Sequence, residues 1–253
     1  MALMQASQNL STTSLKAVIV PPEKPGKVPR SDGIQARSRL LNSALKLFAE
    51  NGFAKTSTRE IAQAAGANIA AISYYFGDKA GLYKAVFVEP LGSPKDDIPT
   101  FDQPHFTLRE SLDGYFVSFL EPMKQSELVQ QCVRLHNREM IEPTGVWAQQ
   151  VEQGIKPAHM ALVSILRRHL KLARVDDELH RLAFAITALA LQMLICRDVF
   201  DAITPQLVTA PTAIDRAARR LADFAESMVE GERVRRTRPV SLKLAAKKSK
   251  QKV

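Results

Sequence analysis

The chain holds one short stretch, between residues 55 and 79, whose side chains have the types and spacing that contacts with DNA require. An amide can bond a base edge in the major groove, and small apolar side chains can meet a thymine methyl group. The candidates for reading bases are Asn68, Ile69, Ala70 and Ser73. Hydroxyl and cationic groups bond phosphate oxygens, and the candidates for that role are Lys55, Thr58, Tyr74, Tyr75 and Lys79. Both sets require a short helix whose first residues can enter the groove.

Local signals predict the helices that would position these groups. The Thr58 hydroxyl can cap a helix, and Gly66 ends that helix. A very short helix follows from about 69 to 75, and Asp78 can cap a further helix through Phe87. A helix, a three-residue turn and a short helix form the geometry that presents the second helix to the major groove.

An amphipathic helix is predicted before this motif, over residues 34–50. The residues on its apolar face are Ile34, Leu41, Leu45 and Phe48. Asn51 and Gly52 form a pair suited to a left-handed C-cap, so the helix should end there. Residues 32–88 are therefore predicted to be a small domain in which a three-helix helix-turn-helix is followed by a fourth helix.

Residues 58–79 resemble the helix-turn-helix of the TetR family nearly position by position. In that family a first helix ending in Phe-x-x-x-Gly-Phe/Tyr precedes a capping threonine, and those places are held here by Phe48, Gly52, Phe53 and Thr58. Residues 68–77 are similar to the CecR-like branch, since the chain has Ile-Ser-Tyr-Tyr-Phe where many members have Leu-Tyr-x-His-Phe. The resemblance covers about residues 34–87 and implies a dimeric transcription regulator.

The rest of the chain is predicted to be a larger helical domain between two tails. Four prolines fall within residues 90–104, where helix is not sustainable, so this stretch is expected to be a linker. The helices predicted after it span about 106–124, 126–141, 146–172 with a bend at Pro157, 177–201 and 212–231. The predicted class is all-α, with a disordered arm over 1–31, a sensing and dimerisation domain over 105–232 and a basic disordered tail over 233–253.

The helix around residues 179–200 is apolar nearly all round, which means that it must be covered on two sides. An ordinary monomeric core could supply both sides. The family resemblance instead implies a four-helix bundle between two subunits, built from residues 177–201 and 212–231 of each. Such a homodimer would place two recognition helices on successive major grooves of a palindromic operator.

The middle helices offer side chains for an apolar cavity with a few polar groups, as a small-molecule effector site requires. The candidates are Phe116, Phe119, His136, Arg138, Glu139 and Trp147. Residues 134–144 also resemble the CecR-like C-terminal domain, in which an Arg-Glu pair precedes Pro-Thr. Taken singly, side chains of these types are more often core residues than ligand contacts, and the resemblance identifies no effector.

The distribution of charge leaves a second function open. The formal net charge is +9, but residues 233–253 alone hold nine Lys or Arg and no acid. The body is basic over 32–87 and acidic over 88–232. The chain could therefore be a nonspecific or architectural DNA-binding protein that depends on its tails, or a helical protein-binding module with a vestigial helix-turn-helix. Steep salt dependence without sequence preference would favour the architectural function.

Other functional classes lack their usual signatures in this sequence. There is no glycine-rich phosphate loop, nucleophile elbow or zinc-binding helix motif, so we expect no enzyme, no cofactor and no metal site. The two cysteines are expected to be reduced and buried. The longest apolar run has 15 residues, and no signal segment is visible, so we expect no membrane span and a cytoplasmic protein of the bacterial nucleoid. The combined expectation is a repressor that a small molecule releases from its operator.

Overall fold

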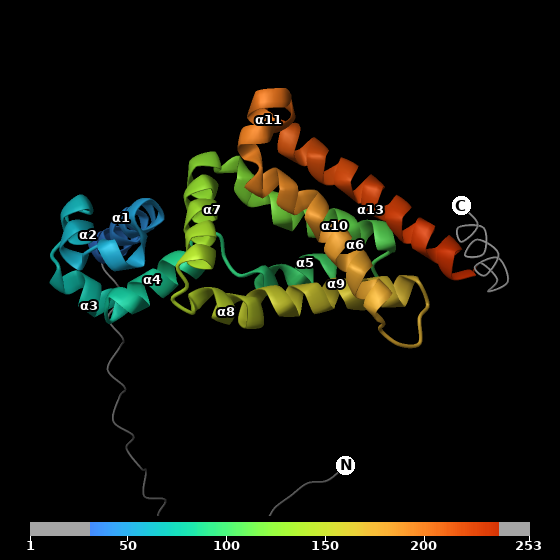
Figure 1. The fold of residues 1–253 in the computed structure, drawn as a ribbon, viewed down its shortest axis with the longest axis horizontal. Helices are drawn as coiled ribbons and strands as arrows, with labels where there is room; N and C mark the ends of the chain where they lie inside the picture. Colours follow the sequence, from blue (N-terminus) through green and yellow to red (C-terminus); the bar gives the residue numbers. More distant parts are fainter. Residues whose placement is uncertain (1–30, 238–253) are drawn as a thin grey trace, which may run out of the picture.

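The computed structural model describes residues 31–237, which form an all-helical chain in two parts (Figure 1). The N-terminal part consists of α1 (Ser31–Lys55), α2 (Thr58–Ala64), α3 (Ala70–Phe76) and α4 (Lys79–Val88). Over this range there is no β-strand, so the predicted all-α class is confirmed. The predicted arm up to residue 30 and the tail from 238 onward lie outside the described residues.

The C-terminal part is larger, and its helix α7 packs against α1 and α4 of the N-terminal part (Figure 1). Its elements are η1 (Pro94–Asp97), α5 (Ile98–Phe101), α6 (Leu108–Leu120), η2 (Glu121–Lys124), α7 (Ser126–Ile141), α8 (Val146–Gln150), the π-helical turn η3 (Val151–Ile155), α9 (Lys156–His169), α10 (Asp177–Ile195), α11 (Arg197–Ile203), α12 (Gln206–Thr209) and α13 (Ala213–Thr237).

The start of α2 corrects the predicted cap by one residue. Thr58 is the first helical residue, and Ser57 is the N-cap. Ser57 Oγ accepts a hydrogen bond from the Glu60 backbone N–H at 3.2 Å, while the Glu60 carboxylate accepts one from the Ser57 N–H at 2.8 Å. This reciprocal pair is a capping box, which satisfies two amides that the helix itself leaves without partners.

Removing this cap should weaken the N-terminal part measurably. We expect Ser57→Ala to lower the free energy of unfolding by about 1 kcal/mol, because a helix-end amide loses its acceptor. Urea unfolding followed by circular dichroism at one fixed protein concentration measures the change. Ser43→Ala, inside α1, is the matched control because Ser43 caps no helix. Equal losses in the two variants would contradict a capping role.

The predicted end of the first helix is confirmed at Gly52, where the backbone leaves helical geometry with φ of 82°. One more turn follows, to Lys55, before α2 begins. Thr56 is buried in this corner, and its hydroxyl donates to the Gly52 carbonyl at 2.8 Å. The corner directs α2 back across α1.

The core of the N-terminal part is closed by residues from both parts of the chain. Phe48 and Tyr83 are almost wholly buried, and their rings meet edge to face at 4.9 Å. Cys132 and Leu135 of α7 belong to the same apolar cluster. Burying each large side chain of this kind contributes about 1.5–3 kcal/mol. The two parts are therefore joined by a shared core.

The prediction of a helix-free linker after α4 is wrong in one respect. The proline-rich segment contains η1 and α5, with Pro94 and Pro99 in their first turns, where a missing amide removes no helical hydrogen bond. Phe101 is buried against α6, close to Gly114. A Cβ at Gly114 would lie 2.5 Å from the Thr100 carbonyl oxygen, so glycine permits this contact. The segment is part of the body.

The later helices follow the predicted ranges with several differences, and the helix predicted over 106–124 divides into α6 and η2. The segment predicted over 146–172 divides into α8, η3 and α9, with the bend just before Pro157, as its missing amide requires. The helix predicted over 177–201 breaks at Cys196. The last helix continues into the predicted tail as far as Thr237. It does so because its arginines are held in ion pairs, for example Arg236 with Asp176 at 2.7 Å.

Within the described range, α10 is one helix that is long and apolar enough to meet the length and composition criteria for a membrane span. A core helix of a protein outside the membrane meets the same criteria. Only 28% of its most apolar window is buried within this chain. Many of its apolar side chains are therefore left uncovered by the chain itself.

Candidate nucleic-acid interface

The short helix α3 is presented to solvent by a buried frame. Ile61 and Ala65 of the α2 segment and Ile72 of α3 are buried in one apolar cluster, in which α2 packs on α1 and α3 packs on α4 and α1. Gly66 has φ of 57°, a left-handed conformation that favours glycine, and it turns the chain between the two helices. Arg39 of α1 donates from Nε to the Ala65 carbonyl at 3.1 Å, which satisfies the end of α2. The frame is rigid while its outer face is open.

All four residues predicted to read bases lie on this outer face. Ile69 is 50% exposed, and Asn68, Ala70 and Ser73 are also exposed. The Asn68 side-chain oxygen accepts a hydrogen bond from the Ala70 N–H at 2.9 Å, so this residue also starts the helix. Its side-chain NH₂ group has no partner in the described chain and remains available as a donor.

The residues predicted to contact phosphate are placed around the same face with differing exposure. Tyr74 is 82% exposed, whereas Tyr75 is half-buried and meets the Tyr74 ring edge to face at 4.9 Å. The Lys79 ammonium lies 4.4 Å from the centre of the Phe53 ring, a cation–π contact that holds it beside the last turn of α1. Lys55 is exposed and Thr58 is half-buried. Tyr74 therefore presents its hydroxyl to solvent on α3, and Lys55 presents an exposed cationic group at the end of α1.

The charge around this face favours a polyanion. From Ala64 to Gly77 the chain carries no acidic residue. Two acids flank this stretch. The Asp78 carboxylate caps α4 and accepts a hydrogen bond from the Gly81 N–H at 2.7 Å. Glu60 is held in the capping box of α2, where hydrogen bonds from Ser57 lower the pKa of its carboxyl. Its negative charge also lies near Lys79. The exposed residues at the start of α3 therefore carry no carboxylate that would repel phosphate.

The six predicted effector residues are not brought together in one cavity. Phe116 is fully buried in the core of the C-terminal part, with Phe119 packed against that core. The other four lie at the junction between the two parts, on α7 and α8. None of the six lines the groove of about 520 Å³ that opens beside α4.

At the junction, Glu139 is a buried carboxylate that joins α4 to α7. It is 1% exposed and accepts hydrogen bonds from the Tyr83 hydroxyl at 2.9 Å and the Thr144 N–H at 2.8 Å. Burial raises the pKa of Glu139, but the hydrogen bonds from Thr144, Tyr83 and Trp147 together hold that pKa below its ordinary value. Burial, followed by the bond to this carboxylate, raises the pKa of Tyr83. The ionised form of the carboxylate is therefore favoured, and both of its oxygens accept hydrogen bonds from the protein.

The other junction residues reinforce this contact. The Phe87 ring of α4 lies 4.2 Å from His136 and 6.3 Å from Trp147, measured between ring centres. Burial lowers the pKa of His136, whose Nδ1 lies 2.6 Å from the Cys132 carbonyl oxygen. Arg138 donates to the Glu50 carbonyl at 2.9 Å and so caps the C-terminal end of the main segment of α1. Movement of α7 would thus be passed to α1 and α4.

Several of these functional contacts were not predicted from the sequence. Ser57 could have been found, because the Ser-x-x-Glu pattern of a capping box is visible in the chain. Tyr83 and Arg39 carry no comparable local signal. Their roles depend on partners 56 and 26 residues away.

The outer face of α10 carries an apolar stripe. Phe184 is 63% exposed, and Leu191 and Ile195 are 38% and 44% exposed. With exposed Ala188, their spacings of four, three and four residues place them on one side of the helix. Phe224 of α13 is 44% exposed as well. This part of the surface is unusually apolar for a monomer.

Two family models match the chain. The model of bacterial regulatory proteins of the tetR family matches residues 40–86, and the model of the C-terminal domain of the HTH-type transcriptional dual regulator CecR matches residues 108–231. The first falls on α1 to α4, and the second spans α6 to α13. Both describe regulators of transcription and not enzymes.

Curated relatives are similar over part of their length. The HTH-type transcriptional dual regulator CecR of Shigella flexneri is 34% identical over 145 residues, which are 53% of this chain and 64% of that protein. The probable HTH-type transcriptional regulator YttP of Bacillus subtilis (strain 168) is 43% identical over 56 residues, 22% of this chain and 27% of that protein. The chain therefore spans less than two thirds of the length of these relatives.

Solved structures share the fold. A TetR family transcriptional regulator, PfmR from Thermus thermophilus, superposes with a TM-score of 0.55 at 19% identity, covering 74% of this chain and 96% of that one. A putative transcriptional regulator from Pseudomonas aeruginosa PAO1 gives 0.57 at 17% identity, covering 81% and 95%. With both family models matched in order along one helical fold, the chain belongs to the TetR family of bacterial regulatory proteins, with a C-terminal domain of the CecR type.

Proposed function

We propose that this protein is a sequence-specific DNA-binding repressor in the bacterial cytoplasm that acts as a homodimer on a palindromic operator. The observation that carries the proposal is the exposed, carboxylate-free face of α3 on its buried frame. Asn68, Ile69, Ala70 and Ser73 read bases, and Lys55, Thr58, Tyr74, Tyr75 and Lys79 hold the phosphate backbone. A small-molecule effector releases the DNA by favouring a different position of the recognition helices.

The apolar stripe on α10 supports the dimer. Its side chains at 184, 191 and 195 would be buried by the same stripe of a second subunit, together with the neighbouring face of α13. A single short recognition helix binds weakly, and linking two of them raises the affinity by a factor of about 100 to 10,000. Dimerisation is therefore part of the DNA-binding mechanism.

The junction residues support a route from effector to DNA. His136, Arg138, Glu139 and Trp147 connect α7 and α8 to α1 and α4, so a ligand that shifts the body would also shift α3. The name of the CecR relative describes a dual regulator, and activation at some promoters is the corresponding variant of this proposal.

The competing function is nonspecific or architectural DNA binding through the basic tail. The described start of that tail offers little free charge, because Arg233, Arg235 and Arg236 are paired with Glu230, Glu232 and Asp176. Nonspecific binding to DNA phosphates would then depend mainly on the basic residues after Thr237. This favours binding through α3.

A selection of genomic DNA fragments bound by the purified protein at about 150 mM salt tests the proposal. We expect one shared palindrome for the full chain and for a chain lacking residues 238–253. Tyr74→Ala should bind the same palindrome more weakly, since Tyr74 is 82% exposed and its loss leaves the core intact. Binding that needs the tail and shows no shared sequence would overturn the proposal in favour of the architectural function.

A further inference from the structure

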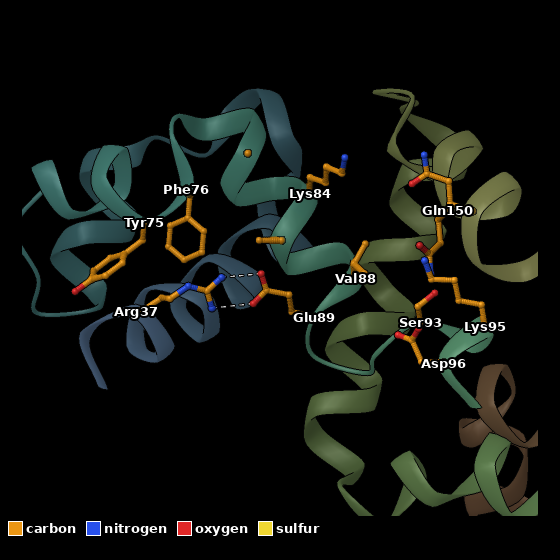
Figure 2. A pocket seen from close by; sticks show the side chains of 13 residues that line it. Arg37, Tyr75, Phe76, Lys84, Val88, Glu89, Ser93, Lys95, Asp96 and Gln150 are labelled. Atoms are coloured by element: carbon orange, nitrogen blue, oxygen red, sulfur yellow. Dashed lines mark hydrogen bonds and ion pairs between the residues drawn. The ribbon is translucent and has the colours of Figure 1, made fainter. Parts of the chain in front are cut away.

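An open groove of about 520 Å³ separates α4 from η1 and the π-helical turn η3 (Figure 2). One wall comes from the N-terminal part, through residues of α1, α3 and α4. The other wall comes from the C-terminal part, through Ser93, Lys95, Asp96, Gln150 and Gln153. A volume of this size accommodates a small organic molecule. Any ligand held here would touch both parts of the chain.

Two buried polar side chains in the groove lack partners. Ser93 and Gln150 are each 8% exposed, and neither side chain makes a hydrogen bond among residues 31–237. Both converge on Gly154, where an added Cβ would lie 2.9 Å from Ser93 Oγ and 3.1 Å from Gln150 Nε2. Their polar atoms are not fully enclosed, so they reach the groove and are available to bond a ligand there.

The backbone at this point is itself unusual. Gly154 is buried within the π-helical turn η3, which lies between α8 and α9. Single π-helical turns inside α-helices occur frequently at functional sites. Here the absence of a side chain at Gly154 leaves the space into which the Ser93 and Gln150 groups point.

The charges of the groove favour an anion with one negative charge. Arg37 and Glu89 neutralise each other in a two-pronged ion pair, with N···O distances of 2.8 and 2.7 Å. The Lys84 and Lys95 ammonium groups have no ion-pair partner in the part of the chain described, and Asp96 is the remaining acid. The lining therefore carries a net charge of about +1.

We infer that this groove binds a small organic monoanion with an apolar body, such as a carboxylate. Lys84 and Lys95 attract the charged group, and the Ser93 hydroxyl and the Gln150 amide donate hydrogen bonds to it. Phe76, Ala85 and Val88 line the groove beside the apolar body. The inference deepens the proposed function and rests on it for one point, that the bound anion acts as the effector. Because the walls belong to different parts, occupancy favours one orientation of α4 over another.

Calorimetric titration of the full chain with 2-naphthoate and with decanoate, without DNA, tests the site. We expect at least one anion to bind with a dissociation constant below about 1 mM, and the uncharged 2-naphthamide to bind at least about tenfold more weakly. Gly154→Ala should weaken anion binding by about tenfold or more, since its methyl group displaces the two polar groups. Lys84→Gln should act similarly by removing one charge.

Matched controls separate the site from general effects. Gly231→Ala adds the same methyl group in α13, where nothing lies within 4 Å, and Lys46→Gln removes an exposed charge of α1 that does not line the groove. Neither should change anion binding. No binding of either anion, or equal effects of Gly154→Ala and Gly231→Ala, would overturn the inference. Since the titration contains no DNA, that failure is distinct from a wild-type protein that selects no operator, which would overturn the proposed function.

Discussion

Replacing Phe184 and Leu191 together by lysine will convert the protein to a monomer and lower its affinity for operator DNA by at least about 100-fold. Phe184 is 63% and Leu191 38% exposed on the apolar stripe of α10, and neither belongs to the buried core, so the folded monomer should tolerate both changes. Phe184 loses a stacking contact with His159. In the dimer, four lysines would face one another across the interface. Like charges in a desolvated interface are strongly unfavourable.

Light scattering during size-exclusion chromatography gives the mass, and fluorescence anisotropy with the selected operator gives the affinity. The control is a second double variant, Val117→Lys with Met140→Lys, which places the same charges on apolar residues that are 48% and 56% exposed outside the stripe. It should remain a dimer with unchanged operator affinity. A dimer that survives the α10 substitutions would show that another surface joins the subunits.

Replacing Glu139 by alanine will lower the free energy of unfolding by about 3 kcal/mol. The carboxylate is 1% exposed and accepts hydrogen bonds from Tyr83 and Thr144, so its removal leaves buried donors without partners. It also releases α4 from α7, and we therefore expect weaker operator binding in the same variant. Glu142→Ala is the control, because its pair with Arg138 is at the surface, where such a contact contributes below about 1 kcal/mol.

Glu139 also predicts a pH dependence with a definite sign. Its pKa is lower in the folded protein than the ordinary value of 4.5, so the folded state favours the ionised form. This contribution to stability is complete above pH 4.5 and is lost as the pH falls through the lower folded pKa. Urea unfolding at a series of acidic pH values should show a shallower loss for Glu139→Gln than for the wild type. Identical pH profiles of the two proteins would show that ionisation of Glu139 does not contribute to stability.

Much of the candidate site could be predicted because its signals are local. A helix end needs a capping side chain, and a tight turn between helices needs a glycine such as Gly66, so both appear in the sequence close to where they act. The Thr58 prediction failed by one residue because adjacent Ser57 and Thr58 can both cap a helix. The effector candidates fared differently: Phe116 and His136 both look suited to a cavity, yet one lies in the body core and the other at the junction.

The sequence by itself determined the all-helical class, the position of the short exposed helix and the family, since helical periodicity and turn residues act over a few positions. Only the tertiary structure decided which helices meet. It brought Glu139 to Tyr83, 56 residues earlier, and Ser93 to Gly154, 61 residues later. Such contacts depend on how whole helices pack, because no short-range pattern records which distant side chain will lie within 3 Å.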